Sequence, residues 1–240
     1  MRKVFVCSIV LMVLTLNVIS AFDKEVKGNG NVTKVQRDIK SFNEIGADGI
    51  FKIYLMQGNK ESVEVEIDEN LQEYVIIKNN GHKLELSFAK GINVKKTTEN
   101  NVYITFKDLK ELDIDGVCNV ESKTTLKCND LKLDIDGVAT IKLELDCGQV
   151  KTDLDGVGNV ELYGKADKLT IKKTGVGSLN SKKLDTKILD INNSGVGNAD
   201  VYASKEISLN NSGVGSITYS GDAAVKALKS DGVGKIKKGN

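Results

Sequence analysis

Gly156-Val157-Gly158-Asn159 is one of seven related tetrapeptides that divide the second half of this 240-residue chain into nearly equal lengths. Each of the seven begins with a glycine, at Gly116, Gly137, Gly156, Gly175, Gly195, Gly213 and Gly232. Successive glycines are 21, 19, 19, 20, 18 and 19 residues apart. A period near 20 residues that persists over several units is typical of a solenoid, in which each unit packs on its neighbours. A glycine at every turn also predicts positive φ there, which the substitution Gly175→Val would test.

Apolar and polar residues alternate on both sides of each repeated glycine. Around Gly137 the apolar positions are Leu131, Leu133, Ile135, Ile141, Leu143 and Leu145. Alternation with a period of two predicts strands with one buried face, so each unit supplies two short strands and two corners. Because such a unit buries its apolar face only against other units, we predict an all-β chain that forms a parallel β-helix of about seven coils. We expect right-handed winding, as in other parallel crossover connections.

Two other repeat folds fit this sequence less well. A β-propeller uses about 40 residues per blade, which is twice the period found here. A leucine-rich repeat has a similar period, but its pattern of leucines and asparagines is missing, and so is any helix signal.

The N-terminus predicts a signal peptide over residues 1–21. Arg2 and Lys3 precede an almost wholly apolar run, and small residues near Ala21 provide a cleavage site. The run is too short to favour a transmembrane helix. We therefore expect an exported protein in the periplasm, at the cell surface or secreted, with no membrane span after the signal is removed.

Residues 22–108 have a strand-like pattern without the repeat, and we interpret them as an N-terminal β-domain that caps the β-helix. A hairpin is predicted around Asn79-Asn80-Gly81, because Asn-Gly favours tight turns between strands. Residues 48–53 resemble one coil, so the repeat could begin there. The predicted organisation is thus a signal peptide (1–21), a β-strand cap (22–108) and parallel β-helix repeats (109–240).

Charge is balanced over the whole chain but not along it. The formal net charge is +1, which argues against a dedicated nucleic-acid partner. Residues 109–161 carry 6 Lys and 12 Asp or Glu, whereas residues 162–240 carry 13 Lys and 7 Asp or Glu. A rod with acidic and basic halves could associate head to tail or bind anionic surface polymers. Solvated lysines on an exposed face are the simpler interpretation.

Six aspartates recur at two positions of the early repeats: Asp113, Asp134 and Asp153, and Asp115, Asp136 and Asp155. Stacked coils would hold each set close enough for the carboxylates to repel one another, and bound Ca²⁺ would relieve that repulsion. The simpler interpretation is that an aspartate beside glycine closes its own turn by accepting a backbone N–H. Thr174, Ser194 and Ser212 favour this interpretation, because they can make the same bond but are poorer calcium ligands. We expect no other cofactor.

Clustered aspartates also occur in polysaccharide-cleaving β-helices, where paired carboxylates act as acid and base. Here the aspartates belong to a register that every coil repeats, whereas a catalytic site is a local departure from a repeat. Aromatic residues, which line sugar subsites, make up only 5% of the chain. We therefore assign no catalytic residues and do not predict an enzyme.

Cys128 and Cys147 each lie nine residues before their repeated glycine. Stacking would bring their Cα atoms within the range of a disulfide, and an oxidising compartment would favour that bond. The alternative, two small residues at a tight corner, stays open. Cys118 occupies a position held elsewhere by alanine or glycine, so we expect it to fill a cramped turn.

Several short motifs add a family resemblance. They are Gly28-Asn29-Gly30-Asn31-Val32, Phe42-Asn43-Glu44-Ile45, Gln57-Gly58-Asn59, Gly91-Ile92-Asn93 and the repeated Gly-Val-Gly units. Together they resemble the head GIN domain family of putative auto-transporter adhesins, over about residues 42–238. The resemblance implies a β-helical protein of the cell surface or periplasm with an adhesive role, and it brings no catalytic residues.

Three functional hypotheses follow. The first is a non-enzymatic exported β-helix that binds a surface ligand, such as a glycan or an envelope component. The second is a polysaccharide-binding or polysaccharide-cleaving β-helix, which an exposed aromatic row formed by Tyr163, Tyr202 and Tyr219 would favour. The third is an envelope scaffold that assembles end to end as a homo-oligomer, since an uncapped last coil leaves an open strand edge.

Overall fold

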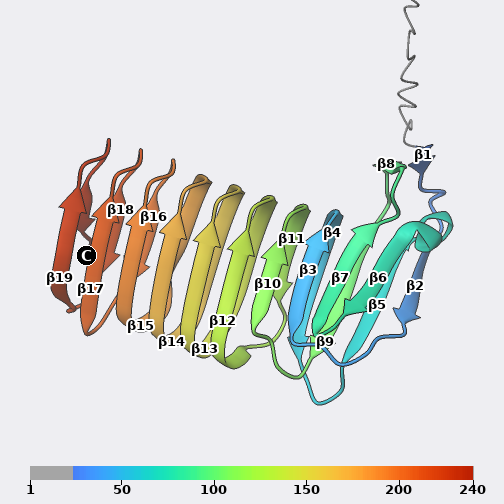
Figure 1. The fold of residues 1–240 in the computed structure, drawn as a ribbon, viewed down its shortest axis with the longest axis horizontal. Helices are drawn as coiled ribbons and strands as arrows, with labels where there is room; N and C mark the ends of the chain where they lie inside the picture. Colours follow the sequence, from blue (N-terminus) through green and yellow to red (C-terminus); the bar gives the residue numbers. More distant parts are fainter. Residues whose placement is uncertain (1–23, 240) are drawn as a thin grey trace, which may run out of the picture.

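The computed structural model describes residues 24–239, which form a row of stacked coils with additional strands at the N-terminal end (Figure 1). The N-terminal elements are β1 (Lys24–Lys27), β2 (Val32–Arg37), β3 (Glu44–Asp48), β4 (Ile50–Gln57), β5 (Ser62–Asp68), the short 3-10 helix η1 (Glu69–Tyr74), β6 (Val75–Asn80), β7 (Lys83–Phe88), β8 (Ile92–Lys96) and β9 (Asn100–Phe106). The remaining strands are β10 (Glu111–Ile114), β11 (Val117–Ser122), β12 (Leu126–Ile135), β13 (Val138–Leu154), β14 (Val157–Lys173), β15 (Val176–Asn193), β16 (Ala199–Tyr202), β17 (Glu206–Asn211), β18 (Ile217–Ser220), β19 (Ala224–Ser230) and β20 (Ile236–Lys238).

Each coil pairs in parallel with the next, in the register that the glycine spacing predicts. Val138 pairs with Val157 between β13 and β14, and Val157 pairs with Val176 between β14 and β15. The long strands β13, β14 and β15 turn a corner within one element, so each runs along both sheets of the solenoid. The predicted parallel β-helix of about seven coils is confirmed.

The parallel stack also includes part of the N-terminal region. β3 pairs in parallel with β10, and β4 pairs in parallel with β11, so residues 44–57 form a coil of their own. This coil contains the 48–53 segment that resembles the later repeat. Beyond it, β7 and β9 continue the two sheets in parallel, and β6, β5 and β2 add antiparallel pairings at this end. The division of the chain at residue 108 stays a prediction.

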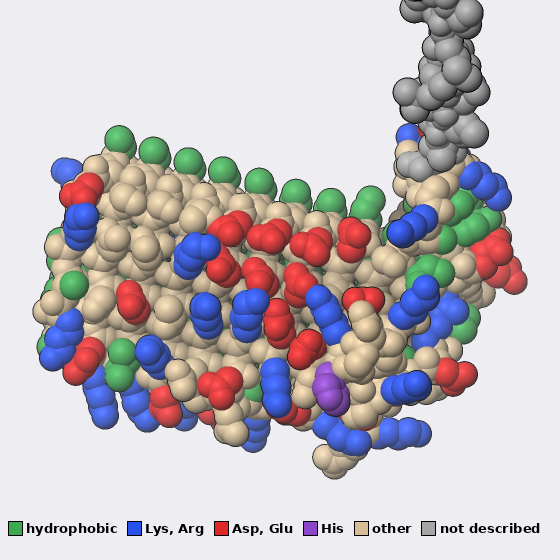
Figure 2. Space-filling view, in the orientation of Figure 1, with side chains coloured by type: hydrophobic (Ala, Val, Ile, Leu, Met, Phe, Trp, Pro, Cys, Tyr) green, Lys and Arg blue, Asp and Glu red, His purple; other side chains and the backbone are tan. Residues whose placement is uncertain are grey.

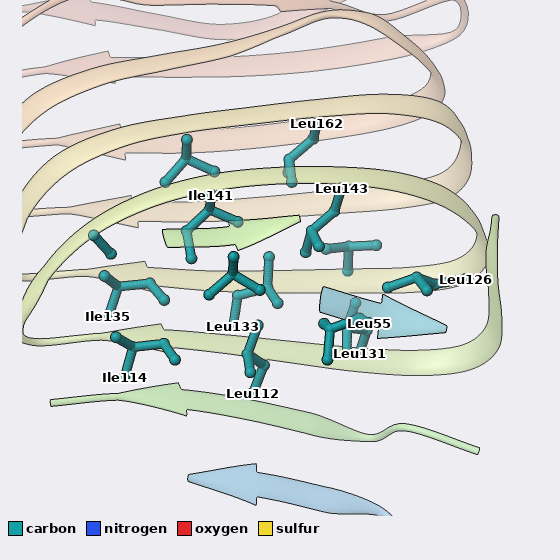
Figure 3. Packing of buried hydrophobic residues seen from close by; sticks show 14 of the residues in the cluster. Leu55, Leu112, Ile114, Leu126, Leu131, Leu133, Ile135, Ile141, Leu143 and Leu162 are labelled. Carbon is teal, nitrogen blue, oxygen red and sulfur yellow. The ribbon is translucent and has the colours of Figure 1, made fainter. Parts of the chain in front are cut away.

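The core is a set of aliphatic columns that run along the axis of the solenoid. Leu112 lies next to Leu133, and Ile114 next to Ile135, because these residues pair in register between β10 and β12 (Figure 3). These side chains are buried, as the alternating sequence pattern predicts. Burying one such side chain contributes about 1.5–3 kcal/mol to stability, so the continuous columns supply the main force that stacks the coils.

The repeated glycines are required for a different reason from the predicted one. The first glycine of each repeat does not have positive φ; instead, a Cβ at Gly137 would overlap the carbonyl oxygen of Gly116 in the preceding coil. Gly175 stands in the same relation to Gly156. Positive φ occurs at the second glycine of the repeat, for example at Gly177 with φ 141°. Close approach of neighbouring backbones therefore selects the first glycine, and close approach together with backbone conformation selects the second, since a Cβ at Gly177 would also overlap the carbonyl oxygen of Gly158.

The cysteines lie in neighbouring coils. Cys128 pairs in register with Cys147, and a disulfide joins them across a Cα–Cα distance of 4.7 Å. Cys118 is a buried free thiol in the turn column, where it pairs with Ala139, and burial raises the pKa of its thiol to about 11.

The predicted signal peptide lies outside the described residues. Within residues 24–239, no helix has the length and apolar character needed to cross a bilayer.

Candidate binding surface

A row of exposed apolar side chains runs along the glycine-turn edge of the solenoid, and we call it the valine ridge. Its members are Ile50, Val117, Val138, Val157, Val176, Val196, Val214 and Val233. They follow one another in register from coil to coil and are visible in Figure 2 as a straight line of hydrophobic side chains along one edge. Their exposed fractions lie between 46% and 72%. Contiguous exposed apolar side chains of this kind mark interaction surfaces.

The alternation of the strand explains why these valines face solvent. In β13 the burial pattern begins with exposed Val138, buried Ala139, exposed Thr140 and buried Ile141. The valine therefore lies on the outer face although its side chain is apolar. The same phase is readable in every repeat, so the sequence pattern contains the signal for this surface. The site residues predicted from the sequence do not include these valines.

Two ladders of aspartates lie beside the valine ridge, on the strands that precede the glycines. The inner ladder consists of Asp113, Asp134 and Asp153, which pair in register. The outer ladder consists of Asp115, Asp136 and Asp155. The structure thus brings the six predicted residues together in two columns, which form an acidic area next to the ridge in Figure 2.

Each aspartate of the inner ladder has a lysine partner. Lys83 Nζ lies 2.5 Å from Asp113 Oδ2, and Lys132 Nζ lies 2.6 Å from Asp134 Oδ2. Lys172 Nζ lies 3.0 Å from Asp153 Oδ1. The hydrogen bond to Asp113 is the main reason why the pKa of Lys83 is raised. The inner carboxylates are therefore neutralised by ammonium groups of the same chain.

The outer ladder does not close the turns as predicted. In the described part of the chain, no hydrogen bond is accepted by the carboxylates of Asp115, Asp136 or Asp155. The backbone closes the turn instead, because Asp136 N and Gly137 N both donate to Ile114 O, at 3.0 and 2.9 Å. Partial loss of hydration, followed by repulsion from neighbouring aspartates, raises the pKa of Asp115 and of Asp136. The turn donors are already paired with the preceding coil, so the carboxylates are left exposed.

Calcium binding by these ladders stays a hypothesis. Across residues 24–239, no group of three or more His, Cys, Asp or Glu side chains has the geometry of a metal site. A cation would have to compete with the lysines that pair with the inner ladder.

A polar ladder lies on the other side of the valine ridge, two residues after each ridge position. Its members are Asn119, Thr140, Asn159, Ser178, Asn198 and Ser216. Asn159 Oδ1 accepts a hydrogen bond from Ser178 N at 3.2 Å, and Asn198 Oδ1 accepts one from Ser216 N at 2.9 Å. These side chains link successive coils and also present amides and hydroxyls to solvent.

A groove of ≈ 440 Å³ lies where the ridge and the polar ladder meet the N-terminal strands. Three exposed apolar side chains line it, those of Ile50, Val117 and Val138. The polar lining comes from the first coils and from the segment that leads into β9, through Lys52, Asn119, Thr140, Thr97, Thr98, Glu99 and Asn100. The groove is a local departure from the repeat, because no later coil has an equivalent of residues 97–100.

Asp68 holds the wall of this groove in place. Its side chain is fully buried and accepts hydrogen bonds from Thr98 N at 2.7 Å, Thr98 Oγ1 at 2.9 Å and Gly30 N at 2.7 Å. Burial by itself would raise the pKa of Asp68, but the hydrogen bonds outweigh it, and the pKa is lowered. An ionised, fully bonded carboxylate therefore fixes residues 97–99 beside the first coils.

Tyr163, Tyr202 and Tyr219 do not form an exposed aromatic row, and Tyr163 pairs in register with Lys183 in the next coil. Tyr219 pairs in register with Val201, so Tyr202 and Tyr219 belong to different columns. Instead Tyr54 and Tyr103 stack, with ring centroids 5.0 Å apart. Since these two residues are 49 positions apart in the sequence, no local pattern identifies the pair.

Lysines cover both outer faces of this stacked pair. Lys123 Nζ lies 4.5 Å from the centre of the Tyr54 ring, and Lys34 Nζ lies 3.7 Å from that of Tyr103. The hydroxyl of Tyr103 donates to Glu66 Oε2 at 2.7 Å, which raises the pKa of Tyr103 to about 12. The pair is held by contacts within the chain and leaves no open ring face for a sugar.

Comparison with known proteins gives one family and several similar folds. A family model described as "Putative auto-transporter adhesin, head GIN domain" matches residues 41–223. The fold is similar to the crystal structure of a putative adhesin from Bacteroides fragilis NCTC 9343, with a TM-score of 0.85, 26% identity and coverage of 89% of this chain and 99% of that one. A putative adhesin from Parabacteroides merdae ATCC 43184 has a TM-score of 0.65 and 25% identity, with coverage of 90% and 99%.

A third solved structure supports the fold alone. It is a putative lipid binding protein from Parabacteroides distasonis ATCC 8503, with a TM-score of 0.73 at 21% identity and coverage of 90% of this chain and 100% of that one. No curated protein matches the sequence.

Proposed function

The chain belongs to the head GIN domain family of putative auto-transporter adhesins, and from this membership we propose that it is an exported, non-enzymatic protein that acts by binding a surface ligand. The observation that carries the proposal is the groove beside residues 97–100, where the repeat is interrupted and apolar and polar groups converge.

Export is supported by the disulfide between Cys128 and Cys147. Such bonds persist in the periplasm, at cell surfaces and outside cells, and are rare in the reducing cytosol. The predicted signal peptide at residues 1–21 would direct the chain there. We propose a final location in the periplasm, at the cell surface or in the medium.

The lining of the groove favours a short glycan segment as the ligand. Sugar rings have apolar C–H faces and hydroxyl edges, and the groove offers Ile50, Val117 and Val138 on one side and hydroxyls and amides on the other. Its volume of ≈ 440 Å³ is within the usual range for small-ligand sites, about 300–1,000 Å³. Lys52 and Glu99 add one charge of each sign, which suits a neutral ligand with many hydroxyls.

The groove is formed before a ligand arrives. The buried carboxylate of Asp68 holds Thr98 through two hydrogen bonds, and the opposite wall belongs to the stacked coils. A rigid site loses little conformational freedom when it binds, which favours affinity.

The same lining supports binding over cleavage. Glycoside hydrolysis ordinarily uses two carboxyl groups that flank the scissile bond. Among the residues that line the groove, Glu99 is the one carboxylate. Both aspartate ladders lie on the other side of the valine ridge, and the inner ladder is ion-paired with lysines.

A glycan array and a cell-surface binding assay with residues 22–240 test the proposal. We expect binding to a restricted set of glycans, and we expect Thr140→Val to weaken it roughly fivefold, because one hydrogen bond is worth about 1 kcal/mol. Ser178→Ala is the matched control, since Ser178 lies in the same polar ladder but outside the groove. Failure to bind any glycan or cell surface would contradict the adhesive role, whereas an unaffected Thr140→Val variant would contradict only the assignment of the groove.

A further inference from the structure

Two Asn-Gly pairs occur in the part of the chain that the structure describes, and neither lines the groove. Asn29-Gly30 lies between β1 and β2, and Asn80-Gly81 lies at the turn between β6 and β7. Because glycine has no Cβ, its backbone nitrogen can approach the side-chain amide carbon of the preceding asparagine closely. We propose that Asn80 is a site of spontaneous deamidation, and that the fold protects Asn29 from the same reaction.

The reaction needs water and neither an enzyme nor an oxidant. The backbone nitrogen of Gly81 forms a bond to Cγ of Asn80, the Cγ–Nδ2 bond breaks, and the amide nitrogen leaves as ammonia with the proton of the Gly81 N–H. Water then opens the cyclic imide at one of its two carbonyl carbons, which gives either aspartate or isoaspartate. Each product carries one more negative charge than asparagine, and in isoaspartate the main chain runs through Cβ and is one carbon longer.

Both reacting groups are open at Asn80. The side chain of Asn80 is exposed, and Gly81 has a φ of 63° with no heavy atom within 4 Å of the position that a Cβ would occupy. Within residues 24–239, no hydrogen bond engages the Asn80 amide or the Gly81 N–H. The neighbouring Asn79 differs, because its Oδ1 accepts a hydrogen bond from Lys40 N at 2.8 Å and its Nδ2 donates one to Lys40 O at 3.0 Å.

The corresponding groups are engaged at Asn29. Asn29 is also exposed, so exposure does not distinguish the two pairs. Instead, Asn29 Oδ1 accepts a hydrogen bond from Asn31 N at 3.0 Å, and Gly30 N donates one of 2.7 Å to the buried carboxylate of Asp68. The Gly30 nitrogen must lose this charge-assisted hydrogen bond before it can attack the asparagine. The same dipeptide therefore has a different reactivity at its two places in the fold.

Isoaspartate at residue 80 would disturb the entry to the first coil. The carbonyl oxygen of His82, in the same turn, accepts hydrogen bonds from Asn43 N at 3.0 Å and from Glu44 N at 3.2 Å, where β3 begins. Asn80 pairs in register with Lys83 across the hairpin, and an extra main-chain carbon at residue 80 shifts this register and displaces His82. We expect the isoaspartate form to have a lower melting midpoint. Asn80→Asp keeps the length of the main chain, so it should melt close to wild type.

Incubation of residues 22–240, folded and with the disulfide intact, in mildly alkaline buffer tests the site, with peptide mapping by mass spectrometry as the readout. We expect Asn80 to convert to aspartate and isoaspartate at least about tenfold faster than Asn29, because a hydrogen bond to a charged group must first break at Gly30. In concentrated urea the two sites should react at similar rates, since the local sequence alone then counts. Gly81→Asn is the matched control, because it removes the Asn-Gly pair from an open turn and should suppress the conversion of Asn80.

An Asn80 that stays intact in the folded protein would overturn the proposed site. Conversion of Asn29 in the folded protein as fast as that of Asn80 would overturn the protection by Asp68. A purified isoaspartate form that melts with wild type would overturn the link between the turn and β3. The glycan-binding assay reads the proposed function separately, because Asn80 and Gly81 lie outside the groove.

Discussion

Lys173 lies in the interior of the solenoid, and its ammonium group donates a hydrogen bond of 2.8 Å to the carbonyl oxygen of Val196 in the next coil. The side chain is only 3% exposed, and its other polar contact is Asn193 Oδ1 at 3.4 Å. The preceding residue of the same column is Leu154, so the core changes at this point from apolar to polar.

Replacing this buried cation should stabilise the protein. Lys173→Met keeps the aliphatic stem and removes a charge that has only neutral partners, and Val196 O still accepts a hydrogen bond from Gly177 N. We expect an increase of about 1–3 kcal/mol in the free energy of unfolding at pH 7, measured by urea denaturation.

The pH dependence of the same variant provides the control. Burial lowers the pKa of Lys173 in the folded state, so the unfolded chain binds more protons between that value and the usual 10.5. The free energy of unfolding of the wild type should therefore increase relative to that of Lys173→Met as the pH rises through this window. A variant that is less stable than wild type at pH 7 would contradict this account of the buried charge.

The polar column continues through a chain of side-chain hydrogen bonds. Asn193 Nδ2 donates to Asn211 Oδ1 at 2.7 Å, and Asn211 Nδ2 donates to Gly215 O at 2.9 Å, with both side chains fully buried. Asn193→Leu leaves the Asn211 oxygen without its donor, so we expect a loss of about 1–3 kcal/mol in thermal or urea unfolding. The double variant Asn193→Leu/Asn211→Leu should lose less than the sum of the two single variants, and strict additivity would mean that the two amides are not coupled.

The close approach of neighbouring turns should make the first glycine of a repeat intolerant of any side chain. A Cβ at Gly175 would overlap the carbonyl oxygen of Gly156, so Gly175→Val should cost about 1–3 kcal/mol or prevent folding. The control is Gly81→Asn in the hairpin, where φ is 63° and the space around a Cβ is open, and this variant should melt close to wild type. A Gly175→Val protein with an unchanged melting midpoint would show that adjacent coils can separate at the turn.

The outer aspartate ladder should destabilise the protein at neutral pH. Partial loss of hydration, and then Asp134 and Asp155, raise the pKa of Asp136 above its usual 3.8. The folded state therefore binds more protons than the unfolded state between 3.8 and the raised value, and stability falls as the pH rises through that window. Asp136→Asn should remove this fall and stabilise the protein at pH 7 by less than about 1 kcal/mol, because the site is exposed.

The ion-paired inner ladder supplies the contrast for that experiment. Asp153→Asn removes the nearer of the two carboxylates beside Lys172, at 3.0 Å, and leaves Asp155 at 3.7 Å, so it should give no such gain. If both variants stabilise the protein equally in pH-dependent melting, repulsion within the outer ladder is not the cause.

Calcium should leave the melting midpoint unchanged. The lysines beside Asp113, Asp134 and Asp153 already compensate the inner carboxylates, and a cation would have to displace them. Melting curves in millimolar CaCl₂ and in EDTA measure this directly. A midpoint that rises with calcium, and no longer rises in Asp134→Asn/Asp136→Asn, would establish the alternative in which the ladders hold the ion.

Most of the fold was predictable because its contacts repeat. Val138 pairs with Val157 because the two residues are one period apart, so spacing alone gives the partner. The alternation around Gly137 likewise predicts which side chains are buried, and it contains the phase that turns the valines outward. The reason for the glycine was not predictable, since a local turn rule points to φ whereas the constraint comes from the carbonyl of Gly116 in the preceding coil.

The candidate groove depends on contacts that have no period. Thr98 reaches its place through Asp68, thirty residues earlier, and then faces coils that contain Val117 and Thr140. Tyr54 and Tyr103 meet in the same way, through the parallel pairing of β4 with β9.

The sequence by itself therefore determined the parallel stack, its register and the outward phase of the ridge, because each of these repeats a local pattern about every 20 residues. Only the tertiary structure decided how the N-terminal strands close over the first coils and which aspartates are paired with lysines. Those features depend on single long-range contacts, such as Lys83 with Asp113 across the junction between the two regions, which occur once in the chain and leave no period to detect.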